Sequence, residues 1–282
     1  MSRSHPEGAG GAGPPAVPPP AFSIAFEGCG CRAAFHVGVI EWFTEHGLLP
    51  EAVAGASSGA LVAAATAVGR VAELRPVWTE LFGTRICDPR RLVSGRWPFR
   101  MSEIVGGAAE RYFGNRLLAD TLIPLSIVVT QLRASGFRRR ALTAHDPVSL
   151  ANAILASCFI PGPYSRMVPI DRRLTVDGAW LGRAPIREAA QLGSLKVVAC
   201  VSDSAGRLLR GALWTRAMAV PDDVDCRVLA PIAPVPVGAF DFDRAATLET
   251  FAIGRASARD FAEKNRAWLG TGDSGLRTGD ST

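Results

Sequence analysis

The stretch that decides the fold runs from Phe22 to Ala65 and reads FSIAFEGCGCRAAFHVGVIEWFTEHGLLPEAVAGASSGALVAAA. It contains two glycine-framed turns, Gly28–Arg32 and Gly55–Gly59. Each turn follows a short apolar run and leads into a segment typical of a helix, which predicts a strand–helix–strand–helix unit. Both turns should therefore lie at the carboxyl ends of parallel strands, the edge where open α/β sheets bind ligands.

The second turn matches the G-x-S-x-G pattern of a nucleophile elbow, with Ser57 at its apex between Gly55 and Gly59. A strand that reverses sharply into a helix brings backbone atoms too close for side chains, which explains the flanking glycines. The pattern predicts that the Ser57 hydroxyl projects above the N-terminus of the following helix.

The first turn offers successive backbone N–H groups beside another predicted helix N-terminus, at Gly28, Cys29, Gly30 and Cys31. Amides in that arrangement suit a developing oxyanion. A serine nucleophile on one turn and a place for negative charge on the other together predict acyl transfer.

The general base is the remaining requirement. A Ser–Asp–His triad in the α/β-hydrolase order needs a histidine well downstream of the serine. The histidines are His5, His36, His46 and His145, and none follows residue 145. Asp177 closes a short strand-like run and precedes Gly178, so a Ser57–Asp177 dyad is the economical solution. Partial desolvation should raise the pKa of Asp177, because a carboxylate with a pKa near 4 is a poor base for serine.

These motifs, in this order, resemble those of the patatin-like lipid acyl hydrolases. The matching segments are Gly28-x-Gly30-x-Arg32 with Gly38 behind it, Gly55-x-Ser57-x-Gly59, Ala156-Ser157-x-x-Ile160-Pro161 and Asp177-Gly178. The resemblance runs from about Phe22 to Trp268. One position departs from the family pattern, since Ala33 stands where glycine usually follows the basic residue.

The resemblance implies that Ser57 is the nucleophile and Asp177 the base of a serine hydrolase that cleaves carboxylic esters of phospholipids or related acyl lipids. It also implies an oxyanion hole at Gly28–Cys31, no cofactor and no metal. Further residues expected to bind substrate or support the site are Arg32, Ser58, Gly178 and Pro161.

Alternating strand-like and helix-like segments predict a three-layer α/β/α sandwich with a mostly parallel central sheet. The 48% hydrophobic and 20% charged content of the 282 residues is ordinary for a globular enzyme. We expect a disordered Gly/Pro-rich tail over residues 1–20, one acyl hydrolase domain over 21–269, and a flexible tail over 270–282.

Composition predicts a cytoplasmic enzyme. Residues 1–20 contain no apolar core of a signal peptide, and no apolar stretch approaches the ~20 residues of a spanning helix. The six cysteines are scattered, which favours a reducing compartment, and the Cys29-x-Cys31 pair lacks a second pair to complete a zinc site. The net charge of +5 permits peripheral contact with a membrane or micelle surface. No nucleic-acid motif is present, and the oligomeric state is left open.

Three segments each allow two interpretations. Residues 83–120 show no clear period and form either a lid or acyl channel, or an irregular helical cap. The run Arg138–Arg140 is either a headgroup contact or a charged edge strand, and the second is favoured. A helix over residues 206–220, with Arg207, Arg210 and Trp214 on one face, is either interfacial or simply solvated, and again the second is favoured.

Two other functions compete with acyl hydrolysis. Gly28-x-Gly30-x-x-Ala33 also fits a dinucleotide fingerprint, although Glu51 precedes the second strand instead of ending it. The chain could instead be a non-catalytic lipid- or protein-binding relative that keeps the fold. Hydrolysis of short esters separates this second alternative from the enzyme.

Overall fold

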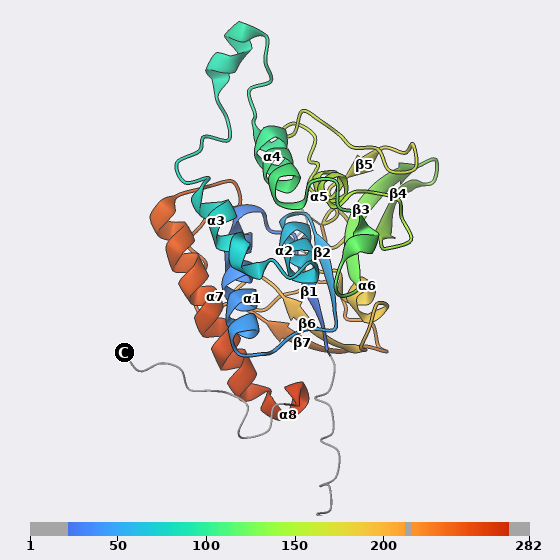
Figure 1. The fold of residues 1–282 in the computed structure, drawn as a ribbon, viewed down its shortest axis with the longest axis vertical. Coiled ribbons are helices and arrows are strands. Elements are labelled where there is room, and N and C mark those ends of the chain that lie inside the picture. The colour runs from blue at the N-terminus through green and yellow to red at the C-terminus, as the bar shows by residue number, and fades with distance from the viewer. Residues whose placement is uncertain (1–21, 212–215, 271–282) are drawn as a thin grey trace, which may run out of the picture.

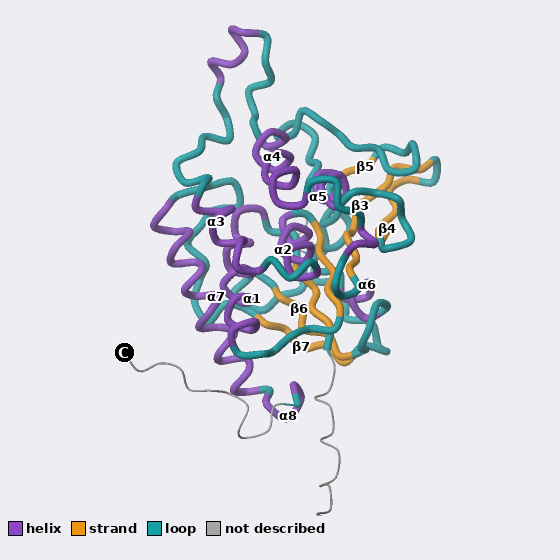
Figure 2. Tube along the Cα trace, viewed as in Figure 1, coloured by secondary structure: helices purple, strands orange, loops and turns teal. Residues whose placement is uncertain are grey.

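The computed structural model describes residues 22–211 and 216–270. A seven-stranded sheet forms its centre (Figures 1 and 2). The strands are β1 Ser23–Phe26, β2 Ala52–Ala56, β3 Leu125–Arg133, β4 Gly136–Leu142, β5 Thr175–Val176, β6 Lys196–Cys200 and β7 Asp225–Leu229. The strand order is β4-β3-β2-β1-β6-β7, with β5 paired to β3. Strands β3, β2, β1, β6 and β7 are parallel to one another, whereas β4 and β5 run antiparallel to β3.

Helices cover both faces of the sheet. One face carries α1 Ala34–Glu45, α2 Ser58–Ala67, α5 Leu150–Ser157 and α7 Arg244–Lys264, and the other carries α6 Ile186–Ala190 (Figure 1). Alternation along the strands explains the layers: in β1, Ile24 and Phe26 belong to the large core under α1 and α2, while Ala25 faces α6. The predicted three-layer α/β/α sandwich with a mostly parallel sheet is confirmed.

The remaining helices lie around this frame. They are α3 Leu74–Thr79, α4 Met101–Phe113, α8 Arg266–Leu269 and the 3₁₀ turns Gly30–Ala33, Val71–Glu73, Pro89–Ser94 and Leu118–Asp120. Helix α4 packs against α5, and between α3 and α4 the chain extends well away from the body of the molecule (Figure 1). The two predicted tails lie outside the described residues, apart from Gly270.

Strand β3 brings two distant parts of the chain together. The pairing of β3 with β2 ends at Val128. Beyond that residue, β5 pairs with β3 along the same side, beginning at Thr130. Because β2 and β5 run toward each other along this side, the residues that follow them meet at the junction. Those residues are Ser57 and Asp177.

The predicted helix over residues 206–220 is wrong. Gly206 and Gly211 adopt left-handed φ angles of 66° and 72°, which interrupt helical geometry. The chain instead doubles back, with an antiparallel bridge between Leu209 and Ala217. Arg207 forms an ion pair with Asp203, and Trp214 lies outside the described residues.

Side-chain caps and breaks set the bounds of two further helices. Helix α5 begins at Leu150, because the Ser149 hydroxyl accepts the Asn152 amide and caps it. The C-terminal helical segment is divided at Asn265 into α7 and α8.

Two glycines allow α1 and α7 to pack closely. A Cβ on Gly38 would lie 2.2 Å from the Phe251 carbonyl oxygen, and one on Gly254 would lie 2.3 Å from the Phe35 carbonyl oxygen. We expect Gly38→Ala to lower the free energy of unfolding by about 2–4 kcal/mol, because the helices must separate.

The matched control is Gly107→Ala in α4, where an added Cβ has no neighbour within 4 Å. This variant should gain about 0.5–1 kcal/mol from helix propensity. Denaturant unfolding of both variants measures the difference; equal stabilities would show that close packing of α1 on α7 is unimportant.

Candidate active site

A strained turn presents Ser57 at the carboxyl end of β2. Ser57 has φ 52° and ψ −129°, a conformation that side chains rarely adopt. The glycines on either side are required by space, because a Cβ on Gly55 would lie 2.4 Å from the Gly59 carbonyl oxygen and one on Gly59 would lie 2.4 Å from that of Phe26. Ser57 is therefore held at the apex of a tight strand-to-helix turn.

The hydroxyl of Ser57 meets the carboxyl group of Asp177. Ser57 Oγ donates to Asp177 Oδ2 at 2.6 Å, while Asp177 Oδ1 accepts the Ala179 amide at 2.8 Å. The exposed fractions of the two residues are only 9% and 1%. Burial raises the pKa of Asp177 from 3.8 to about 6, against the opposing effects of the two hydrogen bonds. The direction is the one expected for a base that acts on serine.

Ser157 supports this pair, a role the sequence analysis did not assign. Its buried hydroxyl accepts the Ser57 amide at 2.9 Å and donates to the Val128 carbonyl at 2.5 Å. Its own carbonyl accepts the Gly178 amide at 2.8 Å. Ser157 thus links the turn after β2, the strand β3 and the turn after β5. The available signal was its place in the Ala156–Pro161 motif.

The loop at Gly28–Cys31 lies beside Ser57, but most of its amides are already engaged. The Gly28 amide donates to the Arg183 carbonyl at 3.1 Å, that of Cys29 to Ser58 Oγ at 3.2 Å, and that of Cys31 to the Ala239 carbonyl at 2.9 Å. Within the described part of the chain, the Gly30 amide has no hydrogen-bond partner. The same holds for the amide of Ser58, the first residue of α2. The amides of Gly30 and Ser58, two residues that line the pocket, therefore remain free to bind a ligand.

The other predicted site residues are placed as follows. Ser58 and Arg32 line the pocket beside Ser57, and Arg32 Nε donates to the Val237 carbonyl at 3.4 Å, which favours a role in steadying the loop. Gly178 leaves no room for a side chain, since a Cβ there would lie 2.0 Å from the Val128 carbonyl oxygen. Pro161 is exposed and does not line the pocket, whereas its neighbour Ile160 does.

A pocket of about 190 Å³ opens onto Ser57 and Asp177. Its apolar walls come from α2, α3, α4 and two later segments and include Leu61, Val77, Trp78, Leu81, Met101, Ile104, Val105, Ala108, Ile160, Tyr164, Phe240 and Phe242. Helix α4, which belongs to residues 83–120, therefore forms one wall of the pocket. Sequence reasoning missed the contribution of residues 237–242, which follow β7 and carry no recognisable motif.

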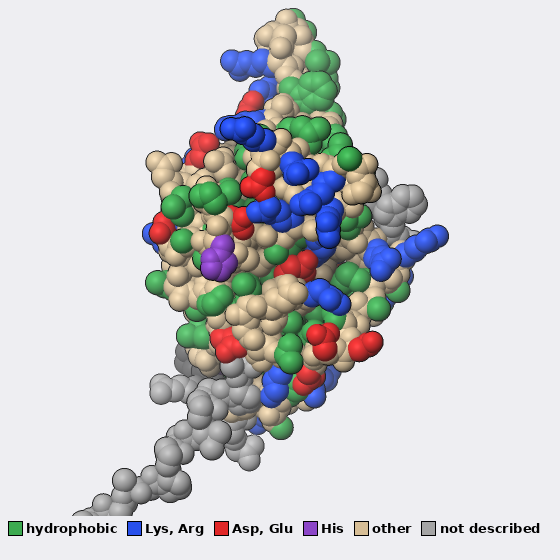
Figure 3. All heavy atoms as spheres, turned by 90° about the vertical axis from the view of Figure 1, so that its right-hand side faces the viewer, with side chains coloured by type: hydrophobic (Ala, Val, Ile, Leu, Met, Phe, Trp, Pro, Cys, Tyr) green, Lys and Arg blue, Asp and Glu red, His purple; other side chains and the backbone are tan. Residues whose placement is uncertain are grey.

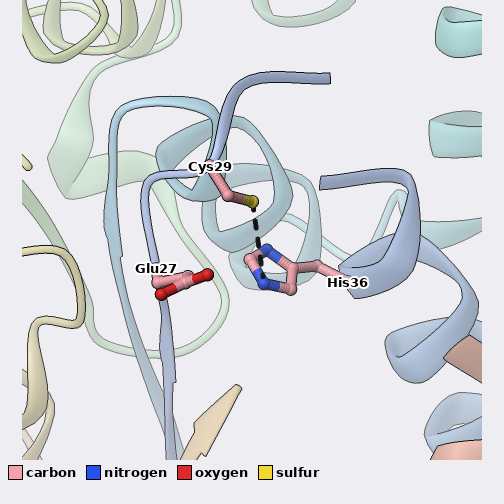
Figure 4. A group of neighbouring side chains, drawn as sticks. All are labelled: Glu27, Cys29 and His36. Carbon is pink, nitrogen blue, oxygen red and sulfur yellow. Dashed lines mark hydrogen bonds between the residues drawn. The ribbon is translucent and has the colours of Figure 1, made fainter. Parts of the chain in front are cut away.

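None of the histidines in the described residues contacts Ser57. His145 is exposed, and His36 is fully buried on α1 beneath the loop (Figure 4). His36 Nε2 lies 4.0 Å from Cys29 Sγ, and donor atoms of Glu27, Cys29 and His36 all lie within 4.8 Å of one another. Burial raises the pKa of Glu27 and Cys29 and lowers that of His36 to about 3.

These shifts favour the uncharged form of each group, so a metal ion would have to bind against them. Glu27 Oε1 also accepts both the amide and the hydroxyl of Ser202, at 2.7 and 2.6 Å. We therefore describe Glu27, Cys29 and His36 as a buried polar support beneath the loop.

Strand β4 forms the edge of the sheet and carries the predicted arginine run. Arg139 pairs with Glu188, and Arg140 pairs with both Asp146 and Asp171. Arginine side chains gather on this face of the molecule (Figure 3), but these two are already neutralised by acidic partners. The geometry agrees with the charged edge strand favoured from the sequence.

Fold and site together define a class: an α/β protein with a serine on a strand-to-helix turn, a carboxyl group against its hydroxyl, and an apolar pocket above both. The family model described as patatin-like phospholipase matches residues 24–190. The match covers more than half of this chain, so the chain belongs to the patatin-like phospholipase family.

Uncharacterized NTE family proteins of Mycobacterium bovis and Mycobacterium tuberculosis are 30% identical to the chain over 178 residues. The match covers 61% of this chain and 46% of each relative, so the chain spans about half the length of these relatives. The crystal structure of VipD from Legionella pneumophila is similar in fold, with a TM-score of 0.51 and 13% identity over 88% of this chain and 67% of that one. Among the described helices, none is both long and apolar enough to span a membrane.

Proposed function

We propose that this protein is a serine lipid acyl hydrolase that cleaves carboxylic esters of phospholipids or related acyl lipids with a Ser57–Asp177 dyad. The observation that carries the proposal is the 2.6 Å hydrogen bond from Ser57 Oγ to Asp177 Oδ2 at the floor of an apolar pocket. The family assignment supports the lipid class of the substrate. Turnover of acyl lipids and of short soluble esters by the purified protein tests it.

In the proposed mechanism, Ser57 Oγ attacks the ester carbonyl carbon while its proton passes to Asp177 Oδ2. The tetrahedral intermediate collapses, the alcohol leaves with the proton from Asp177, and the acyl group remains on Ser57. Asp177 then takes a proton from water, which attacks the acyl-enzyme; as the bond between the acyl carbon and Ser57 Oγ breaks, Asp177 returns this proton to Ser57 Oγ and the fatty acid is released. The raised pKa of Asp177 makes the carboxylate a stronger base, while near neutral pH most of it stays ionised.

The free amides of Gly30 and Ser58 are the donors we propose for the oxyanion. Both residues line the pocket that opens onto Ser57, and the Ser58 amide also lies at the N-terminus of α2, where the helix dipole favours negative charge. The amides of Gly28, Cys29 and Cys31, expected from the sequence to share this role, hold the loop in place through their own hydrogen bonds.

The oxyanion loop should be sensitive to a side chain at Gly30. Gly30 has φ 64°, and a Cβ there would lie 2.1 Å from the Ala239 carbonyl oxygen. Gly30→Ala must therefore shift the loop, and we expect kcat to fall by about 10²–10³-fold, the usual effect of losing one oxyanion donor.

Gly47→Ala is the matched control for this substitution. Gly47 has a similar φ of 70°, but an added Cβ has no neighbour within 4 Å. Both variants carry the cost of a left-handed alanine, so only the loop shift separates their kcat values. Equal kcat values in a short-ester assay would remove Gly30 from the proposed oxyanion hole.

Neither alternative function gains support from the geometry. Glu51 immediately precedes β2, at the end of that strand opposite the Gly28–Arg32 turn, so it is far from where a ribose would lie in a dinucleotide site. A purely binding relative has no need of a strained serine hydrogen-bonded to a buried carboxyl group.

A further inference from the structure

The segment between α3 and α4, residues 83–100, is an arm that projects from the rim of the pocket. It stands above α4, at the end of the molecule opposite α8, and protrudes in two views (Figures 1 and 3). Its two ends adjoin pocket walls, because Leu81 precedes it and Met101 follows it. The arm is therefore continuous with two walls of the pocket.

The arm is an ordered element. Cys87 and Phe99 form an antiparallel bridge across its base, and Asp88 caps the 3₁₀ turn Pro89–Ser94 at its tip. Trp97 Nε1 donates to the Gly162 carbonyl at 2.7 Å, which ties the arm to the segment after α5.

The tip of the arm exposes apolar side chains. Leu92 is 60% exposed and Val93 is 93% exposed, while Trp97 below them is 48% exposed. Adjacent apolar side chains on a projecting turn mark a surface that another apolar phase covers.

The arm that carries this apolar tip is rich in arginine. Residues 83–100 contain five arginines and a single acidic residue, Asp88. Arg91 and Arg100 both form ion pairs with Glu103, whereas Arg85, Arg90 and Arg96 have no ion-pair partner among the residues that the structure describes. A basic arm with an apolar tip is complementary to a bilayer with anionic headgroups, where the apolar tip enters the acyl layer and the guanidinium groups contact phosphates.

We propose that the arm docks this protein on the surface of an anionic lipid bilayer by inserting Leu92 and Val93. The inference rests on the proposed function, since the bilayer would present acyl lipids to the adjoining pocket. An acidic protein surface could attract the arginines, but it offers no apolar layer for the tip. The bilayer is the occupant that fits both features.

The test is sedimentation of the full chain with vesicles made of three parts phosphatidylcholine to one part phosphatidylglycerol, compared with pure phosphatidylcholine. We expect stronger binding to the anionic vesicles. The double variant Leu92→Ser/Val93→Ser should bind them at least about tenfold more weakly. The substitutions Arg85→Gln, Arg90→Gln and Arg96→Gln should each weaken binding to the anionic vesicles by about fivefold.

The matched control is Leu122→Ser/Leu195→Ser. These leucines are 77% and 56% exposed, but they precede β3 and β6. They therefore lie at the amino ends of the parallel strands, opposite the carboxyl ends where the pocket lies. The control should bind vesicles like the unaltered protein. The proposal is overturned if the unaltered protein does not prefer anionic vesicles, or if the Leu92→Ser/Val93→Ser variant binds them equally well.

Turnover of a short soluble ester separates this inference from the proposed function. Leu92 and Val93 do not line the pocket, so their double variant should hydrolyse the soluble ester at the normal rate. If no variant hydrolyses esters but vesicle binding still depends on the tip, the proposed function fails and the docking surface stands. If the Leu92→Ser/Val93→Ser variant hydrolyses the ester normally and binds vesicles as well as the unaltered protein, the docking proposal fails and the proposed function stands.

Discussion

Ser57→Ala is expected to lower ester hydrolysis by at least about 10³-fold, because it removes the atom that forms the acyl-enzyme. The protein should remain folded, since the Ser57 hydroxyl contacts Asp177 while the backbone of the turn is held separately through Ser157. Initial rates with a short soluble ester, alongside circular dichroism and thermal unfolding, measure both effects.

Ser57→Gly provides a matched comparison. It also removes the hydroxyl, but glycine adopts φ 52° without strain, so this variant should be about 1 kcal/mol more stable than Ser57→Ala. Both should be equally inactive. Substantial turnover by either variant would place the nucleophile elsewhere.

Asp177→Asn is expected to abolish hydrolysis at every pH, whereas the activity of the unaltered enzyme should rise with pH through about 6. The reason is that only the ionised carboxyl group can accept the Ser57 proton, and burial raises the pKa of Asp177 to about 6. Asparagine can keep both hydrogen bonds, accepting the Ala179 amide and donating to Ser57 Oγ. A pH profile of kcat/KM measures the effect, and Asp171→Asn, an exposed partner of Arg140, is the control that should leave it unchanged.

The same pKa shift predicts a change in stability with pH. The pKa of Asp177 in the folded protein lies above the ordinary value of 3.8. The stability that the folded protein has with Asp177 protonated is therefore fully present below about pH 4 and is lost as the pH rises through about 6. Above pH 7 the cost of keeping this carboxylate buried approaches about 3 kcal/mol. Relative to the unaltered protein, Asp177→Asn should therefore become more stable between pH 4 and pH 7. A constant difference in unfolding free energy would contradict the raised pKa.

Local signals in the sequence were enough to predict the frame of the site. Gly55 and Gly59 are needed because neighbouring backbone atoms lie where a Cβ would be, and this requirement appears in the sequence as the glycine pattern around Ser57. A short strand-like run precedes Asp177 and Gly178 follows it, so the strand and the position of Asp177 at its end could also be predicted, although β5 is only two residues long. The parallel sheet followed from the alternation of strands and helices.

Contacts between distant segments could not be predicted in the same way. The Cys31 amide is occupied by the carbonyl of Ala239, so which loop amides remain free depends on a segment about two hundred residues away. Apolar and basic side chains at helical spacing indicated a helix over residues 206–220, but Gly206 and Gly211 adopt left-handed φ angles and Leu209 pairs antiparallel with Ala217. Leu92 and Val93 are exposed because the arm projects from the molecule, and no local sequence pattern indicates this projection.

Covalent labelling with a fluorophosphonate probe, followed by peptide mapping, tests the central claim most directly because it identifies the reactive serine without assuming a substrate. The account predicts a single adduct on Ser57 that forms much more slowly in Asp177→Asn, since the Ser57 hydroxyl then lacks its base. An adduct on another serine, or labelling of Ser57 at an unchanged rate in Asp177→Asn, would contradict the proposed Ser57–Asp177 dyad.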